Sequence, residues 1–245
     1  MRTRIRHGLA AALTVSALSL VAACGGGDTK DAAKDAARKD AGKPAATTSA
    51  APTSAAPATP LTAAQMKAGV LELKDLPSGW KTTKHEESST VYKVDKPECQ
   101  PLAPMLGGDI AGATKGATGD FAVGNNASEI AQEVVTFDGA GAADYVKKLG
   151  DALEACPAFT TEAEGNKMKM SVEKIDAPQG AEEALAFRLS LEVAPGIKIE
   201  PNLVVARQGT GVMRFLHLAD TATAKKDFGT LSKLATAKFV KGAQS

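Results

Sequence analysis

Apolar and polar residues alternate along several segments in the second half of the chain. The period of two is clearest over Leu185–Val193, and it is typical of strands that bury one face of a sheet. Two such segments flank the turn residues Gln208–Gly211 and predict a β-hairpin. The pattern as a whole predicts strands at Ser128–Phe137, Met168–Val172, Leu185–Val193, Leu203–Arg207 and Val212–Leu218.

Three other segments repeat apolar residues every three or four positions, which is the spacing of one helix face. The first, Thr62–Leu71, begins with a residue that can cap a helix. A helix over Ala142–Cys156 aligns Tyr145, Leu149, Ala152, Leu153 and Cys156, and a helix over Thr221–Lys241 aligns Ala224, Phe228, Leu231, Ala235 and Phe239. Hairpins with helices around them predict an α+β fold, with a mostly antiparallel, twisted sheet flanked by helices.

The pattern is irregular between the first helix and the first predicted strand. Leu76–Trp80 is a turn that leads the single tryptophan into a strand. A large aromatic residue at such a turn is more typical of a buried plug than of a ligand platform. Five glycines then mark a long irregular stretch, namely Gly107, Gly108, Gly112, Gly116 and Gly119.

The first residues have another pattern, in which three arginines precede an apolar run over residues 9–21. This order, with small residues before a cleavage site, is typical of a secretory signal. The run ends Leu20-Val21-Ala22-Ala23-Cys24, which resembles the lipobox of bacterial lipoproteins, whose cysteine receives a lipid. We therefore expect residues 1–23 to be removed and Cys24 to anchor the chain at the outer face of the cytoplasmic membrane.

The segment from Gly25 to Pro60 has no large apolar residue. Its first half pairs charges at helical spacing, and its second half is rich in Ala, Pro, Thr and Ser, so it cannot bury enough surface to order itself. Residues 24–60 are therefore predicted to be a lipidated cysteine followed by a disordered tether. Residues 61–245 remain as one folded domain of ordinary size.

Charge and cysteine content narrow the function. Removing residues 1–23 takes away three arginines and no acids, which leaves 26 basic and 28 acidic side chains and changes the net charge from +1 to −2. Nucleic acid is excluded as a partner, because its binding requires a basic surface. Cys99 and Cys156 are the two remaining cysteines, and an even pair in an oxidising compartment predicts a disulfide.

Candidates for catalysis and cofactor binding are few. His85 lies in a polar run, and His217 shares a strand face with apolar residues, which is more typical of a packed residue than of a catalyst. The acidic pair Glu182-Glu183 is adjacent in sequence, whereas a glycosidase holds two carboxyls across a cleft. The sequence has no G-x-S-x-G elbow, H-E-x-x-H motif or clustered zinc ligands. We expect no enzyme activity, no cofactor and no metal.

Polar residues alternate with the apolar ones on the predicted strands. Arg188, Ser190 and Glu192, with Arg214 on a neighbouring strand, either line a cleft or face water. Alternation by itself does not separate these two arrangements. The ligand-binding residues are therefore left open at this point.

Four motifs lie in the predicted domain: Asp75-Leu76-Pro77-Ser78-Gly79-Trp80, Pro97-Glu98-Cys99, Glu154-Ala155-Cys156-Pro157-Ala158-Phe159 and Asn202-Leu203-Val204-Val205-Ala206-Arg207-Gln208-Gly209. In these motifs the chain resembles the extracellular sensor domain of PknH-type actinobacterial receptor kinases, and the free-standing lipoproteins that share it. The resemblance implies an antiparallel sheet flanked by helices, a cleft that receives a ligand, and no catalytic residue. The second disulfide and the kinase domain of the kinase-borne members are absent from this sequence.

The sequence therefore predicts a lipid-anchored, non-enzymatic domain that binds or senses a ligand outside the cytoplasmic membrane. Its expected partners are the membrane, through the lipid on Cys24, and a small molecule, cell-wall component or protein. The alternative is a carrier that shields an acyl chain, which needs a large apolar cavity, whereas a sensor cleft is shallower and more polar. A cell-wall enzyme is the third hypothesis.

Overall fold

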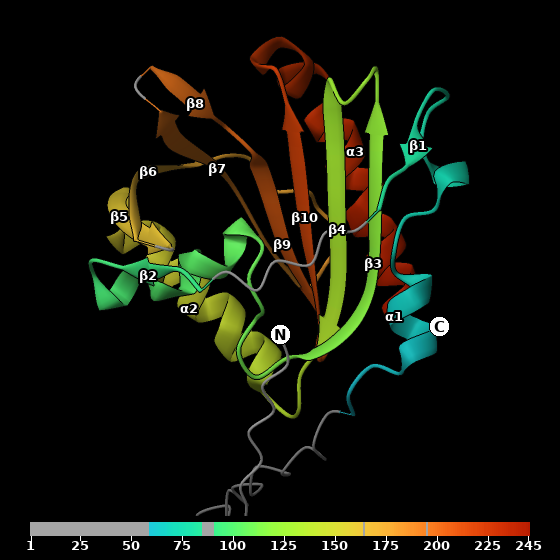
Figure 1. Ribbon diagram of the computed structural model, residues 1–245. Coiled ribbons are helices and arrows are strands. Elements are labelled where there is room, and N and C mark those ends of the chain that lie inside the picture. The colour runs from blue at the N-terminus through green and yellow to red at the C-terminus, as the bar shows by residue number, and fades with distance from the viewer. Residues whose placement is uncertain (1–58, 85–90, 164, 195) are drawn as a thin grey trace, which may run out of the picture. The chain divides into compact units, whose positions relative to one another are not determined.

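A computed structural model describes residues 59–84, 91–163, 165–194 and 196–245. Within these ranges ten strands form one antiparallel sheet in the order β1-β3-β4-β10-β9-β7-β6-β5-β2, and β8 pairs with β7 (Figure 1). The strands are β1 (Lys81–Thr82), β2 (Lys93–Val94), β3 (Thr114–Val123), β4 (Ser128–Thr136), β5 (Ala158–Ala163), β6 (Asn166–Lys174), β7 (Glu183–Ala194), β8 (Ile197–Ile199), β9 (Asn202–Gln208) and β10 (Gly211–Ala219). The α-helices are α1 (Ala63–Ala68), α2 (Gly141–Ala155) and α3 (Thr221–Ala243), and the 3-10 helices are η1 (Leu73–Asp75) and η2 (Pro97–Leu106).

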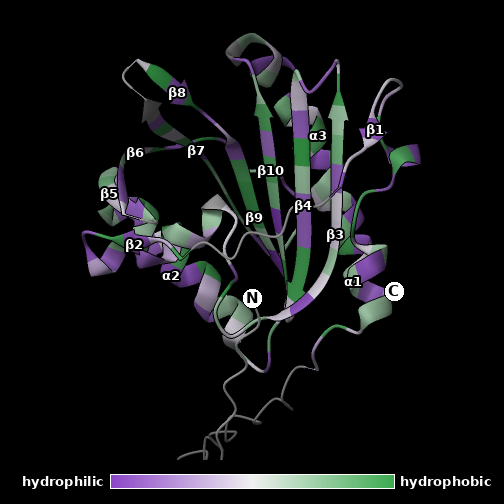
Figure 2. Ribbon diagram, viewed as in Figure 1, coloured by the Kyte–Doolittle hydropathy of each residue, from purple (hydrophilic) through white to green (hydrophobic). Residues whose placement is uncertain are grey.

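Helices pack on both faces of the sheet, so the domain has two apolar cores. On one side, called the α3 face, α1 and α3 cover β3, β4, β9 and β10 around Ile130, Val134, Phe215 and Phe239. On the other side, called the α2 face, α2 and η2 pack around Leu149, Phe187, Leu203 and Val205. Hydrophobic residues of β4 and β10 point to both faces, Val134 and Met213 into the core of the α3 face and Val135 and Val212 into that of the α2 face, and Figure 2 shows hydrophilic residues between them.

The predicted α+β fold is confirmed. All five predicted strands and all three predicted helices are present, with ends that differ by a few residues. The Thr62 hydroxyl accepts a hydrogen bond from the Gln65 backbone N–H, so the predicted cap is correct. Trp80 is buried in the core of the α3 face, which confirms its interpretation as a plug. Among the described residues, no helix combines the length and apolarity needed to cross a membrane.

The irregular stretch predicted around the glycines is wrong in its second half. Thr114–Val123 is the ten-residue strand β3, which pairs with β4 along most of its length. Its glycines are needed because β4, α1 and the loop after α1 lie very close to the strand. A Cβ atom on Gly116 would lie 2.2 Å from the Val134 carbonyl oxygen, and one on Gly119 would lie 2.7 Å from Val70. These residues reflect a close approach inside a strand and do not mark a loop.

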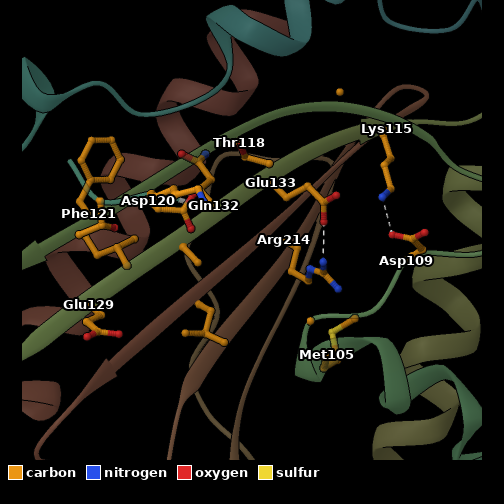
Figure 3. A pocket seen from close by; sticks show the side chains of 17 residues that line it. Met105, Asp109, Lys115, Thr118, Asp120, Phe121, Glu129, Gln132, Glu133 and Arg214 are labelled. Atoms are coloured by element: carbon orange, nitrogen blue, oxygen red, sulfur yellow. Dashed lines mark hydrogen bonds and ion pairs between the residues drawn. The ribbon is translucent and has the colours of Figure 1, made fainter. Parts of the chain in front are cut away.

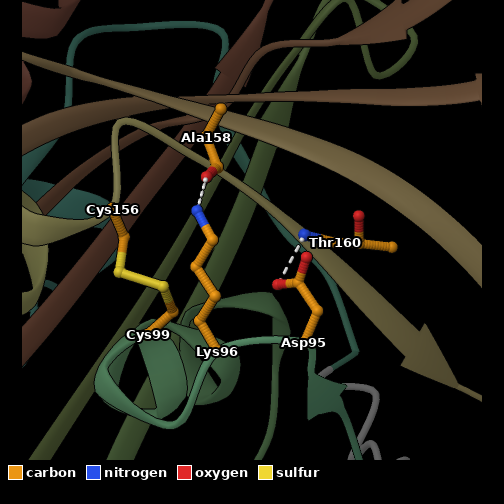
Figure 4. Close-up of a disulfide and its surroundings, with 6 residues drawn as sticks. All are labelled: Asp95, Lys96, Cys99, Cys156, Ala158 and Thr160. Carbon is orange, nitrogen blue, oxygen red and sulfur yellow. Dashed lines mark hydrogen bonds between the residues drawn. A yellow bond between two sulfur atoms is a disulfide. The ribbon is translucent and has the colours of Figure 1, made fainter.

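Cys99 and Cys156 form the predicted disulfide, with Cα atoms 5.8 Å apart (Figure 4). The bond joins the start of η2 to the end of α2, and both cysteines are fully buried. Two hydrogen bonds tie the chain just before η2 to β5. Lys96 Nζ donates to the Ala158 carbonyl at 3.3 Å, and the Thr160 N–H donates to Asp95 Oδ1 at 3.0 Å. The disulfide therefore holds η2 against α2.

Candidate functional site

A hollow with polar side chains lies on the α2 face, where α2 leaves part of the sheet uncovered. Among the described residues, the contacts of α2 with the sheet concentrate on β7 and β9, so α2 leaves much of β3, β4 and β10 uncovered on that face. The end of η2 forms one wall, and the chain after β1 forms another. The cavity, called here the η2 pocket, has a volume of about 440 Å³ (Figure 3). The side chains that line it include Lys84, Met105, Asp109, Lys115, Thr118, Asp120, Glu129, Ala131, Glu133, Arg214 and Leu216.

Arg214 is the residue that joins the floor of the pocket to its wall. It lies opposite Glu133 in the register of β10 and β4, and Nη2 is 2.6 Å from Glu133 Oε2. Nη1 donates to the Pro104 carbonyl and, at 3.0 Å, to the Gly108 carbonyl, both at the end of η2. Only 14% and 18% of the two side chains are exposed. Since the pair is largely buried, losing one partner would leave an uncompensated charge, and η2 would lose its attachment to the sheet.

The remaining polar side chains of the pocket give it a small excess of negative charge. The lining has four acidic residues, Asp109, Asp120, Glu129 and Glu133, and three basic ones, Lys84, Lys115 and Arg214. Lys115 Nζ lies 2.8 Å from Asp109 at the rim of the pocket. Met105, Ala131 and Leu216 supply apolar patches between these charges. Such a lining suits a polar ligand with some apolar surface, because charged groups in the wall need hydrogen-bonding partners.

The hydroxyl of Tyr145 is a second polar group beside the Arg214–Glu133 pair. It is buried and has no hydrogen-bond partner among the described residues. Burial raises the pKa of the Tyr145 phenol, which Arg214 lowers and Glu133 raises to a smaller extent, so the group is protonated at neutral pH. The ring stacks on Phe137 with centroids 5.6 Å apart. A protonated donor therefore lies near the Arg214–Glu133 pair.

Of the four polar residues left open by the sequence, the structure brings only Arg214 into the pocket. Arg188 is bound to Glu173 at 2.9 Å and to Asn202 at 3.1 Å. Ser190 donates to Glu200 at 3.2 Å. Glu192 is exposed on the same strand, opposite Lys198 of β8. These three residues belong to the other end of the sheet and do not line the pocket.

The acidic pair Glu182-Glu183 binds Arg207, with distances of 2.6 Å and 3.1 Å. This is a surface ion-pair network rather than two carboxyls across a cleft. The sequence analysis identified none of the acidic residues of the pocket, Asp109, Asp120, Glu129 and Glu133, and it also missed Thr118. Three of them lie on β3 or in the segment before it, which had been predicted to be irregular. Glu129 and Glu133 of β4 are four residues apart, so both point to the same face of the sheet. This spacing was the one indication of the pocket that the sequence contained.

His217 lies on the α3 face, away from the pocket. Its Nε2 atom is 2.8 Å from the Ser128 hydroxyl oxygen, both residues are buried, and the imidazole stacks on Phe228 with centroids 6.2 Å apart. Its Nδ1 atom has no partner among the described residues. A serine and a histidine in contact resemble a nucleophile and its base, but neither lines the η2 pocket. The interpretation of His217 as a packed residue is confirmed.

We expect the buried His217 to make the domain less stable in mild acid. Burial lowers its pKa, and Asp227 opposes this shift more weakly. The unfolded state then binds more protons than the folded state below the ordinary pKa of about 6.5. The free energy of unfolding should fall as the pH falls from about 6.5 toward the folded-state pKa, by at most about 1.4 kcal/mol per pH unit.

The measurement is urea denaturation at several pH values from 7.5 to 5. A His217→Leu variant loses the Ser128 contact, so it should be less stable at pH 7.5, yet it should lose less stability on acidification. A parallel pH dependence of the two proteins would show that His217 is not the group responsible.

The predicted signal peptide, the lipidated Cys24, the tether up to residue 58 and His85 lie outside the described residues. Within the described residues, no group of three or more His, Cys, Asp or Glu side chains is arranged to hold a metal ion.

Comparison with solved structures shows the fold of this domain in another protein. The chain is similar to the extracellular domain of PknH from Mycobacterium tuberculosis, with a TM-score of 0.52 and 18% identity over 76% of this chain and 98% of that one. An uncharacterised protein from Mycobacterium smegmatis, an Rv0999 ortholog, matches with a TM-score of 0.37 and 11% identity over 70% and 93% of the two chains. No protein-family profile and no curated protein matches the sequence. At 18% identity, the likeness to the PknH domain is one of fold.

Proposed function

We propose that residues 61–245 form a non-enzymatic binding domain for a polar small molecule, held at the outer face of the cytoplasmic membrane by a lipid on Cys24. The observation that carries the binding function is the η2 pocket, a hollow of about 440 Å³ on an uncovered part of the sheet. Its walls are held by the disulfide and by Arg214. An extracytoplasmic location is supported by the fold, which the PknH domain carries outside the cell.

The charged lining favours a polar ligand over an acyl chain. A site that shields an acyl chain needs a long apolar cavity, because charged side chains lose their hydration when they are covered by hydrocarbon. The η2 pocket instead has seven ionisable side chains among five apolar ones. The carrier hypothesis is for this reason the second candidate, and co-purified fatty acid in mass spectra of the exported protein would promote it.

The partners of Arg214 and the burial of the Ser128–His217 pair favour binding without catalysis. Arg214 is engaged by one carboxylate and two backbone carbonyls, so it stiffens the pocket wall. The Ser128–His217 pair is buried beneath α3, whereas catalysis requires a nucleophile and base within reach of the substrate. The pocket residues thus resemble a recognition surface more than a catalytic set.

The decisive experiment fills the pocket with a larger side chain and leaves its charged residues unchanged. Ala131 lies on the pocket floor and is half-buried, so Ala131→Phe should place a ring in the cavity. Small polar metabolites and cell-wall fragments would be screened against the exported protein by ligand-observed NMR. We expect a compound that binds the native protein to bind Ala131→Phe at least about tenfold more weakly, since the two cannot occupy the same volume.

The matched control is Ser171→Phe, which adds the same ring at an exposed strand position outside the pocket. It should bind the compound as the native protein does. Equal binding to Ala131→Phe would place the ligand elsewhere. Chemical conversion of the compound, abolished by His217→Ala, would reject the non-enzymatic proposal.

The lipid anchor is tested separately through Cys24. Cells expressing the native chain should incorporate labelled fatty acid into it, and Cys24→Ala should abolish the label and release the protein from the membrane fraction. Label that persists in Cys24→Ala would contradict the anchor while leaving the binding proposal untouched.

A further inference from the structure

The pairing of β10 with β9 ends before β10 itself ends, and the two neighbouring parts of the sheet separate there. His217 of β10 pairs with Asn202 of β9, but Leu218 and Ala219 pair only with β4. The chain before β9 instead follows β7 as the short strand β8, and Figure 1 shows β8 diverging from β10. Within the described part of the chain, β8 has β7 as its one neighbour. Its outer edge therefore leaves backbone donors and acceptors without a strand partner.

This edge differs from the two strands at the ends of the sheet. β1 and β2 are two residues long, and each includes an exposed lysine, Lys81 and Lys93 respectively. Short edges with charged side chains are how proteins prevent strands from pairing with other chains. β8 is also short and also has an exposed lysine, Lys198, but on the face opposite that lysine it exposes 58% of Ile197 and 38% of Ile199. Two exposed isoleucines on an open edge are typical of a site that accepts another strand.

Lys198, which lies between the two isoleucines, limits which strand of another chain can pair with β8. Lys198 lies opposite Glu192 of β7, while Ile199 lies opposite Leu191. If β8 paired with a second copy of itself over all three residues, Lys198 would face the same lysine, and like charges directly opposite destabilise a pair of strands. An acidic residue at that position would instead extend the Glu192–Lys198 ladder with alternating charge. Apolar neighbours on either side would contact Ile197 and Ile199.

We infer that the outer edge of β8 binds an extended segment of another protein by strand addition, with an acidic residue between two apolar ones. Backbone hydrogen bonds provide the attachment, and the side-chain pattern gives the specificity. This surface is independent of the η2 pocket, because none of the three β8 residues lines that cavity.

The test is a charge exchange across the new pair of strands. The probes are two acetylated and amidated peptides, Ser-Thr-Val-Glu-Val-Thr-Ser and the same peptide with Lys in place of Glu. The protein is the chain with Cys24→Ser, alone or with Lys198→Glu, observed by amide NMR. The protein that keeps Lys198 should bind the Glu peptide about fivefold more tightly than the Lys peptide. The largest amide shifts should be those of residues 197–199. Lys198→Glu should reverse this preference.

A second variant tests the apolar contacts. Ile197→Thr with Ile199→Thr keeps side chains suited to a strand at exposed positions, so it should fold and bind both peptides more weakly. The proposal is overturned if millimolar peptide leaves the amides of residues 197–199 unshifted, or if Lys198→Glu does not change the preference. It is also overturned by self-association that the double threonine variant abolishes, which would assign the edge to a second copy. Loss of vesicle binding in that variant would assign the edge to lipid.

Discussion

Replacing Gly116 by alanine is expected to destabilise the domain by about 2–3 kcal/mol, as overpacked cores do. The added Cβ would lie 2.2 Å from the Val134 carbonyl oxygen and 2.4 Å from Met66 Sδ. The methionine can change rotamer, but the carbonyl belongs to the backbone of β4, which is paired on both sides. Relief therefore requires β3 to move away from β4. The melting temperature should fall by roughly 8 °C for a domain of this size.

The matched control is Gly229→Ala in α3. A Cβ atom there meets nothing within 4 Å, and the residue is exposed in the middle of a helix. Alanine should stabilise the domain by about 0.5–1 kcal/mol, because it has the higher helix propensity. Thermal unfolding followed by circular dichroism separates the two results. A native melting temperature for Gly116→Ala would mean that β3 and β4 do not approach each other as closely as described.

Removing the disulfide should have an effect of similar or larger size. Cys99 and Cys156 are 57 residues apart in sequence, and closing a loop of this length contributes about 4 kcal/mol in the chain-entropy model. The Cys99→Ala, Cys156→Ala double variant should therefore melt roughly 10 °C lower. It should also loosen η2, since the bond holds that wall of the pocket on α2. Ligands of the η2 pocket should then bind more weakly.

The control for the double cysteine variant is Lys96→Ala, which removes one exposed hydrogen bond to Ala158 and keeps the disulfide. Its melting temperature should stay within about 2 °C of the native value, since exposed contacts of this kind contribute little. A reductant should lower the melting temperature of the native protein to that of the double variant and leave the double variant unchanged. A reductant that has no effect on the native protein would contradict the predicted stabilisation.

The candidate site was only partly accessible from the sequence. Arg214 and the acidic residues of β4 were visible as polar positions in predicted strands. Their partnership was not, because the pairing of Glu133 with Arg214 depends on the register of β4 against β10, which joins residues 81 positions apart. Asp120 and Thr118 were missed with β3, whose glycines resemble a loop until the proximity of α1 is known. The contact between Ser128 and His217 could not be predicted either, because it also depends on the register of β4 against β10.

The sequence by itself determined the α+β class, five of the ten described strands, the three α-helices, the capping of α1 and the disulfide partners. Each of these follows from local periodicity, from a local cap or from a count of two cysteines, so no distant contact has to be known. Only the tertiary structure decided that helices cover both faces of the sheet, that α2 leaves β3, β4 and β10 open, and that β8 diverges from β10. These features depend on long-range register and on which face each helix occupies, and a one-residue change of register would turn every side chain of a strand to the other face.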